Sequence, residues 1–213
     1  MSQYQWLHEF DTYRHKNLVY LRTLKCGSTY YANIFEKLGW TKSTADTINW
    51  DIDHVFSFIM EPYERRLKGL TEFVFANGQR DLLQLDKFFW GGVLYLDMHA
   101  IPYSISYGKY IDKVDWIPLD CKNFDNDLAI TMLDSLLATY GLHYKFPLAK
   151  EHESSENKIK IYQTIKEKTG DGNYAIHIGL EDDIDLYHRV CTKISPWLLT
   201  TDTWHNVSWL KQL

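Results

Sequence analysis

The sequence predicts an α/β fold in which a parallel β-sheet is flanked by helices. Two segments, residues 18–40 and residues 54–75, each begin with a short apolar run, pass through a compact loop or turn and continue with apolar residues at helical spacing. Residues 114–119 are predicted as a third buried strand, and they precede another helical pattern. Because strands that alternate with helices are joined by crossovers, this order favours a parallel sheet.

Length and composition are those of one globular domain. The chain has 213 residues, 45% of them hydrophobic and 24% charged, so we expect a single domain over residues 1–213. The net charge of −5 argues against a general binder of nucleic acids or of membrane surfaces, although it allows a local basic cleft. The eight Trp and fifteen Tyr suit a packed core at least as well as a carbohydrate site.

The N-terminus and the cysteines indicate a cytoplasmic protein. The first sixteen residues lack the apolar region of a secretory signal, and no run of about 18 apolar residues predicts a membrane span. Cys26, Cys121 and Cys191 form no CxxC pair, which is typical of reduced thiols. A positive potential beside Lys25 would lower the pKa of Cys26, but a small residue that fits a turn is the simpler interpretation. The oligomeric state stays open.

The first segment predicts a strand, an anion-binding loop and a helix. Gly27 lets the backbone turn its N–H groups toward a ligand, Lys25 adds a full charge, and Ser28 and Thr29 add hydroxyl groups at the start of the helix. Neither G-x-x-x-x-G-K-[ST] nor G-x-G-x-x-G is present. Taken alone, the loop is equally consistent with a simple turn in which Ser28 is the N-cap and Lys25 is solvated.

The second segment predicts a strand buried on both faces and a helix that begins at Pro62. Residues 55–59 are apolar except for Ser57, and a proline costs little at the first helical position. The first two turns of this helix carry Arg65, Arg66 and Lys68. Because cations there oppose the helix dipole, a bound anion is one explanation, and an ordinary solvated basic face is the other.

The rest of the chain supplies further elements. Residues 82–96 are apolar-rich, and we expect them to be helical as far as Gly91. We further expect a helix over 128–140, a polar loop over 145–157, a charged helix over 158–168, a turn over 170–173 and a helix over 178–194. Ligands of open parallel sheets bind at the carboxyl ends of the strands. The loop at Lys25 and the turn at Met60 should therefore meet in one site.

Together these motifs resemble the sulfotransferases that use 3′-phosphoadenosine 5′-phosphosulfate (PAPS). In that family a P-K-x-G-[ST]-T loop holds the 5′-phosphosulfate, and an R-x-P-x-x-R-x-x-S turn and helix hold the 3′-phosphate. Here residues 24–29 read LKCGST and residues 60–68 read MEPYERRLK. Three later segments are similar to the carbohydrate branch of the family, namely DMHAIP at 97–102, VDWIPLDCKNFDNDL at 114–128 and DDIDLYHR at 182–189.

The resemblance implies a P-loop NTPase-like sulfotransferase fold that moves a sulfuryl group from PAPS to a hydroxyl of a glycan or small molecule, without a metal. The donor-binding residues that it implies are Lys25, Cys26, Gly27, Ser28, Thr29, Tyr30, Arg65 and Lys68. Lys25 would also be catalytic, because it would neutralise the charge that develops on the bridging oxygen of the leaving phosphate.

The acceptor hydroxyl needs a base, and His99 is the first candidate. It lies in the segment that resembles the family, and a histidine titrates near neutral pH. A structural histidine bonded to the backbone is the competing interpretation. Asp97, His54 and Glu72 are the reserves for the same role.

Two positions depart from the family pattern and leave alternatives open. Met60 stands where the family has an arginine, and Lys68 stands where it has a serine; both family residues contact the 3′-phosphate. Lys68, with Arg65 or Arg66, would supply charge, but a lysine binds as a point charge and a bidentate contact is lost. A catalytically degenerate binding protein with the same fold is thus the first alternative. A nucleotide-dependent kinase ranks lower, because neither a Walker lysine nor an acidic magnesium motif is evident.

Overall fold

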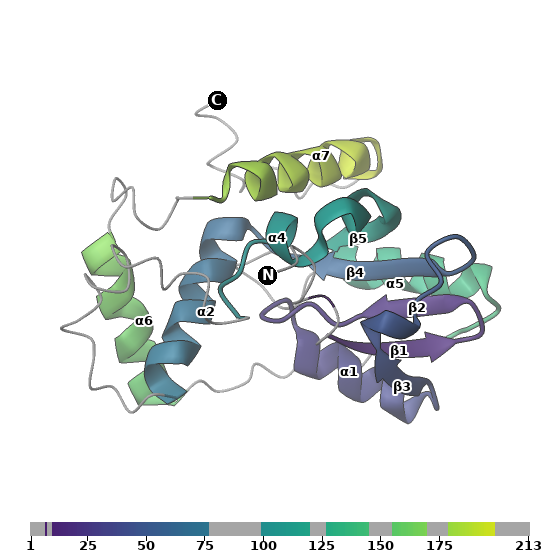
Figure 1. Ribbon diagram of the computed structural model, residues 1–213, viewed down its shortest axis with the longest axis horizontal. Coiled ribbons are helices and arrows are strands. Elements are labelled where there is room, and N and C mark those ends of the chain that lie inside the picture. Colours follow the sequence, from purple (N-terminus) through teal and green to yellow (C-terminus); the bar gives the residue numbers. More distant parts are fainter. Residues whose placement is uncertain are drawn as a thin grey trace.

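The computed structural model describes residues 7, 10–76, 99–119, 127–144, 155–169 and 179–198. These residues form five strands and six α-helices (Figure 1). In chain order they are β1 Asp11–His15, β2 Leu18–Leu21, α1 Ser28–Lys37, β3 Thr41–Thr44, β4 His54–Ile59, α2 Pro62–Ala76, α4 Tyr103–Tyr107, β5 Val114–Pro118, α5 Asp127–Thr139, α6 Glu156–Thr169 and α7 Glu181–Leu198. Two 3₁₀-helices, η2 Ala45–Thr47 and η5 Gly108–Lys113, complete this set. The stretch predicted over 82–96, the turn over 170–173 and Asp97 lie outside the described residues.

The sheet is mixed, with the strand order β3-β1-β2-β4-β5. The α/β class is confirmed, and β2, β4 and β5 are parallel neighbours as predicted. The prediction of a wholly parallel sheet is wrong, because β1 pairs antiparallel with both β2 and β3. A two-residue turn with Lys16 at φ 54° joins β1 to β2, and a connection this short permits only an antiparallel pair.

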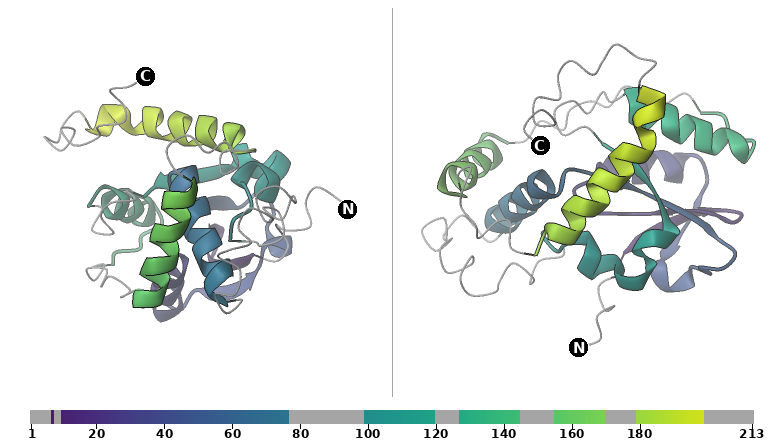
Figure 2. Two further views of the ribbon diagram at one scale, coloured as in Figure 1. Left: turned by 90° about the vertical axis from the view of Figure 1, so that its left-hand side faces the viewer. Right: turned by 90° about the horizontal axis from the view of Figure 1, so that it is seen from above.

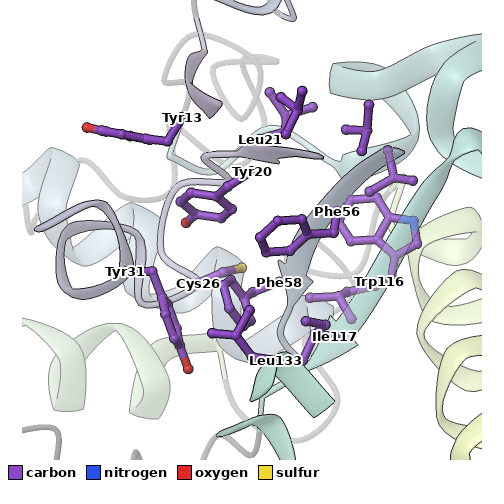
Figure 3. Packing of buried hydrophobic residues seen from close by; sticks show 14 of the residues in the cluster. Tyr13, Tyr20, Leu21, Cys26, Tyr31, Phe56, Phe58, Trp116, Ile117 and Leu133 are labelled. Atoms are coloured by element: carbon purple, nitrogen blue, oxygen red, sulfur yellow. The ribbon is translucent and has the colours of Figure 1, made fainter. Parts of the chain in front are cut away.

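Aromatic contacts of β4 and β5 show which helices cover each face of the sheet. Phe58 lies on one face, where the ring of Tyr31 from α1 stacks on it at 3.7 Å between centroids (Figure 3). Ser57 lies on the other face, beside Trp116 of β5 in the strand register. The ring of Trp116 meets Tyr107 of α4 there at 4.9 Å. Helices therefore pack on both faces, which explains why both faces of β4 are buried and why its residues from Val55 to Ile59 are apolar except for Ser57.

Helix α6 packs along α2 through a second, smaller apolar cluster (Figure 2). The buried residues of this cluster are Leu67, Leu70, Val74, Ala100, Ile161 and Ile165. Helix α7 contacts β5, α4 and α2 (Figure 1). Among the helices described here, none has the length and apolar character that crossing a bilayer requires.

Candidate functional site

The loop between β2 and α1 has the backbone geometry of an anion-binding nest. Lys25 and Gly27 have positive φ angles of 65° and 64°, and Cys26 between them does not. Alternation of this kind turns successive N–H groups into a concavity that suits an anion. The first intrahelical hydrogen bond of α1 runs from the Tyr31 amide to the Gly27 carbonyl at 3.1 Å, so the amides of Ser28 and Thr29 precede it.

No side chain of the described residues caps α1. The N-cap residue is Gly27, in the left-handed conformation, and Ser28 is the first residue of the helix and is buried. The alternative interpretation of the loop, with Ser28 as the N-cap, is therefore wrong. An uncapped helix start leaves amide donors for a ligand or for water.

The Lys25 loop and the Met60 turn emerge at the same edge of the sheet, as expected. Both follow the carboxyl ends of parallel neighbours, β2 and β4. The hydroxyl group of Tyr103 joins them, because it receives a hydrogen bond from the Met60 amide at 3.0 Å and lies 3.0 Å from Cys26 Sγ. The two segments that carry the family resemblance are thus in contact through the core.

The arginines of α2 are not a solvated basic face, and this interpretation of the second segment is wrong. Both side chains are buried, with Arg65 only 1% exposed. Arg65 donates from Nε to the Leu24 carbonyl at 3.1 Å and from Nη1 to the Ile101 carbonyl at 2.6 Å, and its guanidinium lies over the ring of Tyr103. Its Nη2 makes no hydrogen bond within the described part of the chain. Arg65 therefore supports the anion loop from inside the core.

Lys25 shares a carboxylate with a lysine from a distant helix. Its Nζ lies 2.9 Å from Glu72 Oε2, and Lys158 Nζ of α6 lies 2.9 Å from the same oxygen and 3.1 Å from Oε1. Burial raises the pKa of Glu72, but the hydrogen bonds from Lys158 and Lys25 outweigh it and lower the pKa to about 2. A carboxylate this acidic is a poor general base, so the structure argues against the reserve role of Glu72.

The two positions that depart from the family pattern are neighbours in space. Lys68 Nζ lies 3.8 Å from Met60 Sδ and 3.6 Å from Glu64 Oε1. Met60 is buried, whereas Lys68 is half-buried and lies at the edge of the sheet where β4 ends. Glu61 accepts hydrogen bonds from the Tyr63 and Glu64 amides at 3.1 and 2.7 Å, so its side-chain carboxylate caps the N-terminus of α2.

His99 lies beside α2, and His54 does not belong to this edge. A Cβ added to Gly69 would stand 2.3 Å from the His99 carbonyl oxygen, so the backbone at His99 touches α2 one turn before Glu72. His54 begins β4 and pairs with Leu18, at the opposite end of the parallel strands. There its Nδ1 lies 2.7 Å from the Tyr140 hydroxyl and its Nε2 contacts Asp115.

Cys26 is a buried packing residue. Its side chain is fully buried beneath the loop and belongs to the main core cluster (Figure 3). Burial raises the pKa of its thiol, which opposes the lowering expected from the positive loop. The small residue that fits the turn is the better interpretation, and any contact of Cys26 with a ligand would use its backbone.

Three further residues of the site carried no individual prediction: Tyr103, Lys158 and Asp183. The buried Asp183 of α7 accepts hydrogen bonds from the Tyr103 and Ser104 amides at 2.6 and 2.8 Å and thereby caps α4. Asp183 stands within the DDIDLYHR segment, so the resemblance offered a signal for it. The sequence carried no signal for Lys158, because nothing distinguishes it from the other lysines of α6.

Neither of two hollows that described residues line includes the Lys25 loop. One of about 570 Å³ lies beside η5, where the rings of Trp50 and Tyr110 stack at 4.3 Å. The other, of about 930 Å³, lies between α4 and α7. Nowhere in the described ranges do three or more His, Cys, Asp or Glu side chains gather as metal ligands.

Comparisons of the chain with family profiles, with curated proteins and with solved structures find no match. The fold and the site define an α/β protein with a lysine-bearing strand–loop–helix at the carboxyl edge of its parallel strands. Its function is therefore inferred from this site.

Proposed function

We propose that the protein is a sulfotransferase that binds PAPS at the loop of residues 25–29 and transfers its sulfuryl group to a hydroxyl of a glycan or small molecule. The observation that carries the proposal is the alternation of positive φ at Lys25 and Gly27 directly before the uncapped start of α1. Backbone amides in this arrangement favour the tetrahedral anions phosphate and sulfate.

The chemistry follows from where charge develops. The S–O bond to the phosphate breaks as a new S–O bond forms to the acceptor oxygen, and negative charge builds on the former bridging oxygen. Lys25 would neutralise that oxygen, while the amides and hydroxyl groups of Ser28 and Thr29 hold the 5′ end of the donor. His99 is the proposed base for the acceptor proton, since its segment packs against α2 one turn from Glu72, the partner of Lys25.

The 3′-phosphate is assigned to Lys68 in this proposal. Lys68 is half-buried at the end of β4, whereas Arg65 is occupied with the Leu24 and Ile101 carbonyls. Arg65 therefore acts on the donor through the loop that it supports. A lysine on its own gives a point-charge contact, so the affinity for the 3′-phosphate should be modest.

A binding protein without transferase activity is the second candidate. The observation that favours it is the ion pair between Lys25 and Glu72, which engages the charge that catalysis would need. Met60 also favours this candidate, because it replaces an arginine that contacts the 3′-phosphate in the family. Binding of donor without sulfate transfer to any of a panel of hydroxyl acceptors would select this candidate.

Titration calorimetry with 3′-phosphoadenosine 5′-phosphate (PAP) tests the proposal. We expect saturable binding by the wild-type protein and weaker binding of adenosine 5′-monophosphate, which lacks the 3′-phosphate. ATP with and without magnesium tests the kinase alternative in the same experiment. Absence of PAP binding, or tight magnesium-dependent binding of ATP in its place, would reject the sulfotransferase proposal.

A further inference from the structure

Two ammonium groups converge on one carboxylate oxygen at the anion loop. Lys25 and Lys158 each place Nζ 2.9 Å from Glu72 Oε2, so the two nitrogens lie within twice that distance of each other. The lysines come from opposite parts of the chain, one from the loop after β2 and one from α6. Like charges this close repel unless an anion lies between them. The geometry is therefore that of a cation pair built around one anionic oxygen.

The position of Lys158 is fixed by the packing of its helix. Ile161 and Ile165 of α6 are buried against α2, and the Tyr162 hydroxyl donates to Glu64 at 2.8 Å. Lys158 Nζ also lies over the ring of Phe75, 4.7 Å from its centroid. Lys158 is thus held toward α2 by its helix, in contrast to the exposed Lys160 two residues later.

Lys25, Lys158 and Glu72 together carry a net positive charge, which attracts an anion. Two lysines face one glutamate, which leaves a net charge of about +1 at the mouth of the nest. A carboxylate oxygen and an oxygen of a phosphate or sulfate ester accept the same hydrogen bonds from an ammonium group. Glu72 is part-exposed, at 30% of its side chain, so it has room to withdraw.

We propose that Lys25 and Lys158 form a two-lysine site for one anionic oxygen of a phosphate or sulfate ester, and that Glu72 occupies this position when no ligand is bound. Glu72 is then an internal competitor of the ligand, and Lys158 is a second binding lysine. This inference rests on the proposed function in that it takes the ligand to be the 5′ end of the donor.

Affinities for inorganic sulfate and for PAP, measured by calorimetry at fixed ionic strength, test the inference. Glu72→Gln should tighten binding by about three- to tenfold, because the competitor loses its charge and keeps its shape. Lys158→Gln should weaken binding by about ten- to hundredfold, the scale of one hydrogen bond to a charged group. Lys158→Arg should retain most of the affinity, since it restores a cation at the same place.

The control variants change exposed residues of α6 that lie away from the site. Lys160→Gln and Glu167→Gln change the net charge by the same amounts away from the site, and they should leave affinity unchanged. The inference is overturned if Glu72→Gln weakens binding, or if Lys158→Gln behaves as Lys160→Gln does. Circular dichroism of each variant confirms that it is folded.

The results separate this inference from the proposed function. If PAP binding depends on Lys25 and not on Lys158 or Glu72, the inference fails and the sulfotransferase proposal stands. If sulfate binds with the predicted effects and PAP does not bind more tightly than sulfate, the two-lysine site stands and the donor assignment fails. If neither anion binds, both fail.

Discussion

Lys25 combines a disfavoured backbone conformation with a charged partner. A positive φ is uncommon for a residue other than glycine, and conformations of this kind cost roughly 1–3 kcal/mol and cluster at functional sites. The same residue places its ammonium group against Glu72, beside the nest formed by its own backbone. A single residue therefore contributes both the shape and the charge of the proposed anion site.

Replacement of Lys25 by alanine should lower sulfate transfer far more than it weakens donor binding. The expected loss of turnover is about 10²–10³-fold, typical of one electrostatic contact to a developing charge. A transfer assay alongside PAP titration checks this, with Lys37→Ala, an exposed lysine at the end of α1, as the control. Turnover at the wild-type rate would remove Lys25 from the mechanism.

Glu72 should make stability depend on pH in the acid range. Its pKa is lowered from 4.5 to about 2 in the folded protein, so the stabilisation is present above the unfolded value and is lost as pH falls through the folded one. Between pH 4.5 and 2 the wild-type free energy of unfolding should fall more steeply than that of Glu72→Gln. The difference should be about 1–2 kcal/mol, after allowance for solvent screening of a part-exposed pair. Denaturant titrations at several pH values measure it, and parallel profiles would contradict it.

At the scale of elements, α2 organises the site. It contacts the anion loop through Arg65, the segment 99–102 through Gly69 and Arg65, and α6 through Glu72. Each of these residues lies one helical turn from the next, so they share one side of the helix. The turns of α2 therefore set the spacing between Lys25, His99 and Lys158.

Gly69→Ala should destabilise the protein, although alanine is the better helix former by about 1 kcal/mol. The added Cβ would stand 2.3 Å from the His99 carbonyl oxygen, and backbone atoms cannot yield as a flexible side chain does. A loss of about 1–3 kcal/mol is expected from such overpacking. Urea unfolding measures it, and a gain in stability would show that α2 and segment 99–102 are not in close contact.

For the whole molecule, the sequence predicted the buried parallel strands and missed the sheet edge. Strands β4 and β5 are mostly buried and mostly apolar, so their sequences indicate core strands. β1 reads DTYRH and β3 reads TKST, and these polar segments resemble loops. Their strand character comes from antiparallel pairing with neighbours, which local sequence does not encode.

The candidate site was predictable where a motif is local and not where it is assembled from distant parts. The Lys25 loop and the Met60 turn were found because glycine, proline and strand ends mark them in the sequence. The burial of Arg65 and Arg66 was missed, because cations are usually placed on the surface. The pairing of Lys158 with Glu72 spans 86 residues and depends on how α6 docks on α2.

The central claim is that the nest of residues 25–29 binds the 5′ end of a nucleotide anion, and a crystal structure with bound PAP tests it most directly. We predict a 5′-phosphate oxygen within hydrogen-bonding distance of Lys25 Nζ and of the amides of Ser28 and Thr29. The Glu72 carboxylate should then have moved away from Lys25, while the 3′-phosphate lies beside Lys68. A nucleotide bound elsewhere, with the Lys25–Glu72 ion pair intact, would contradict the account.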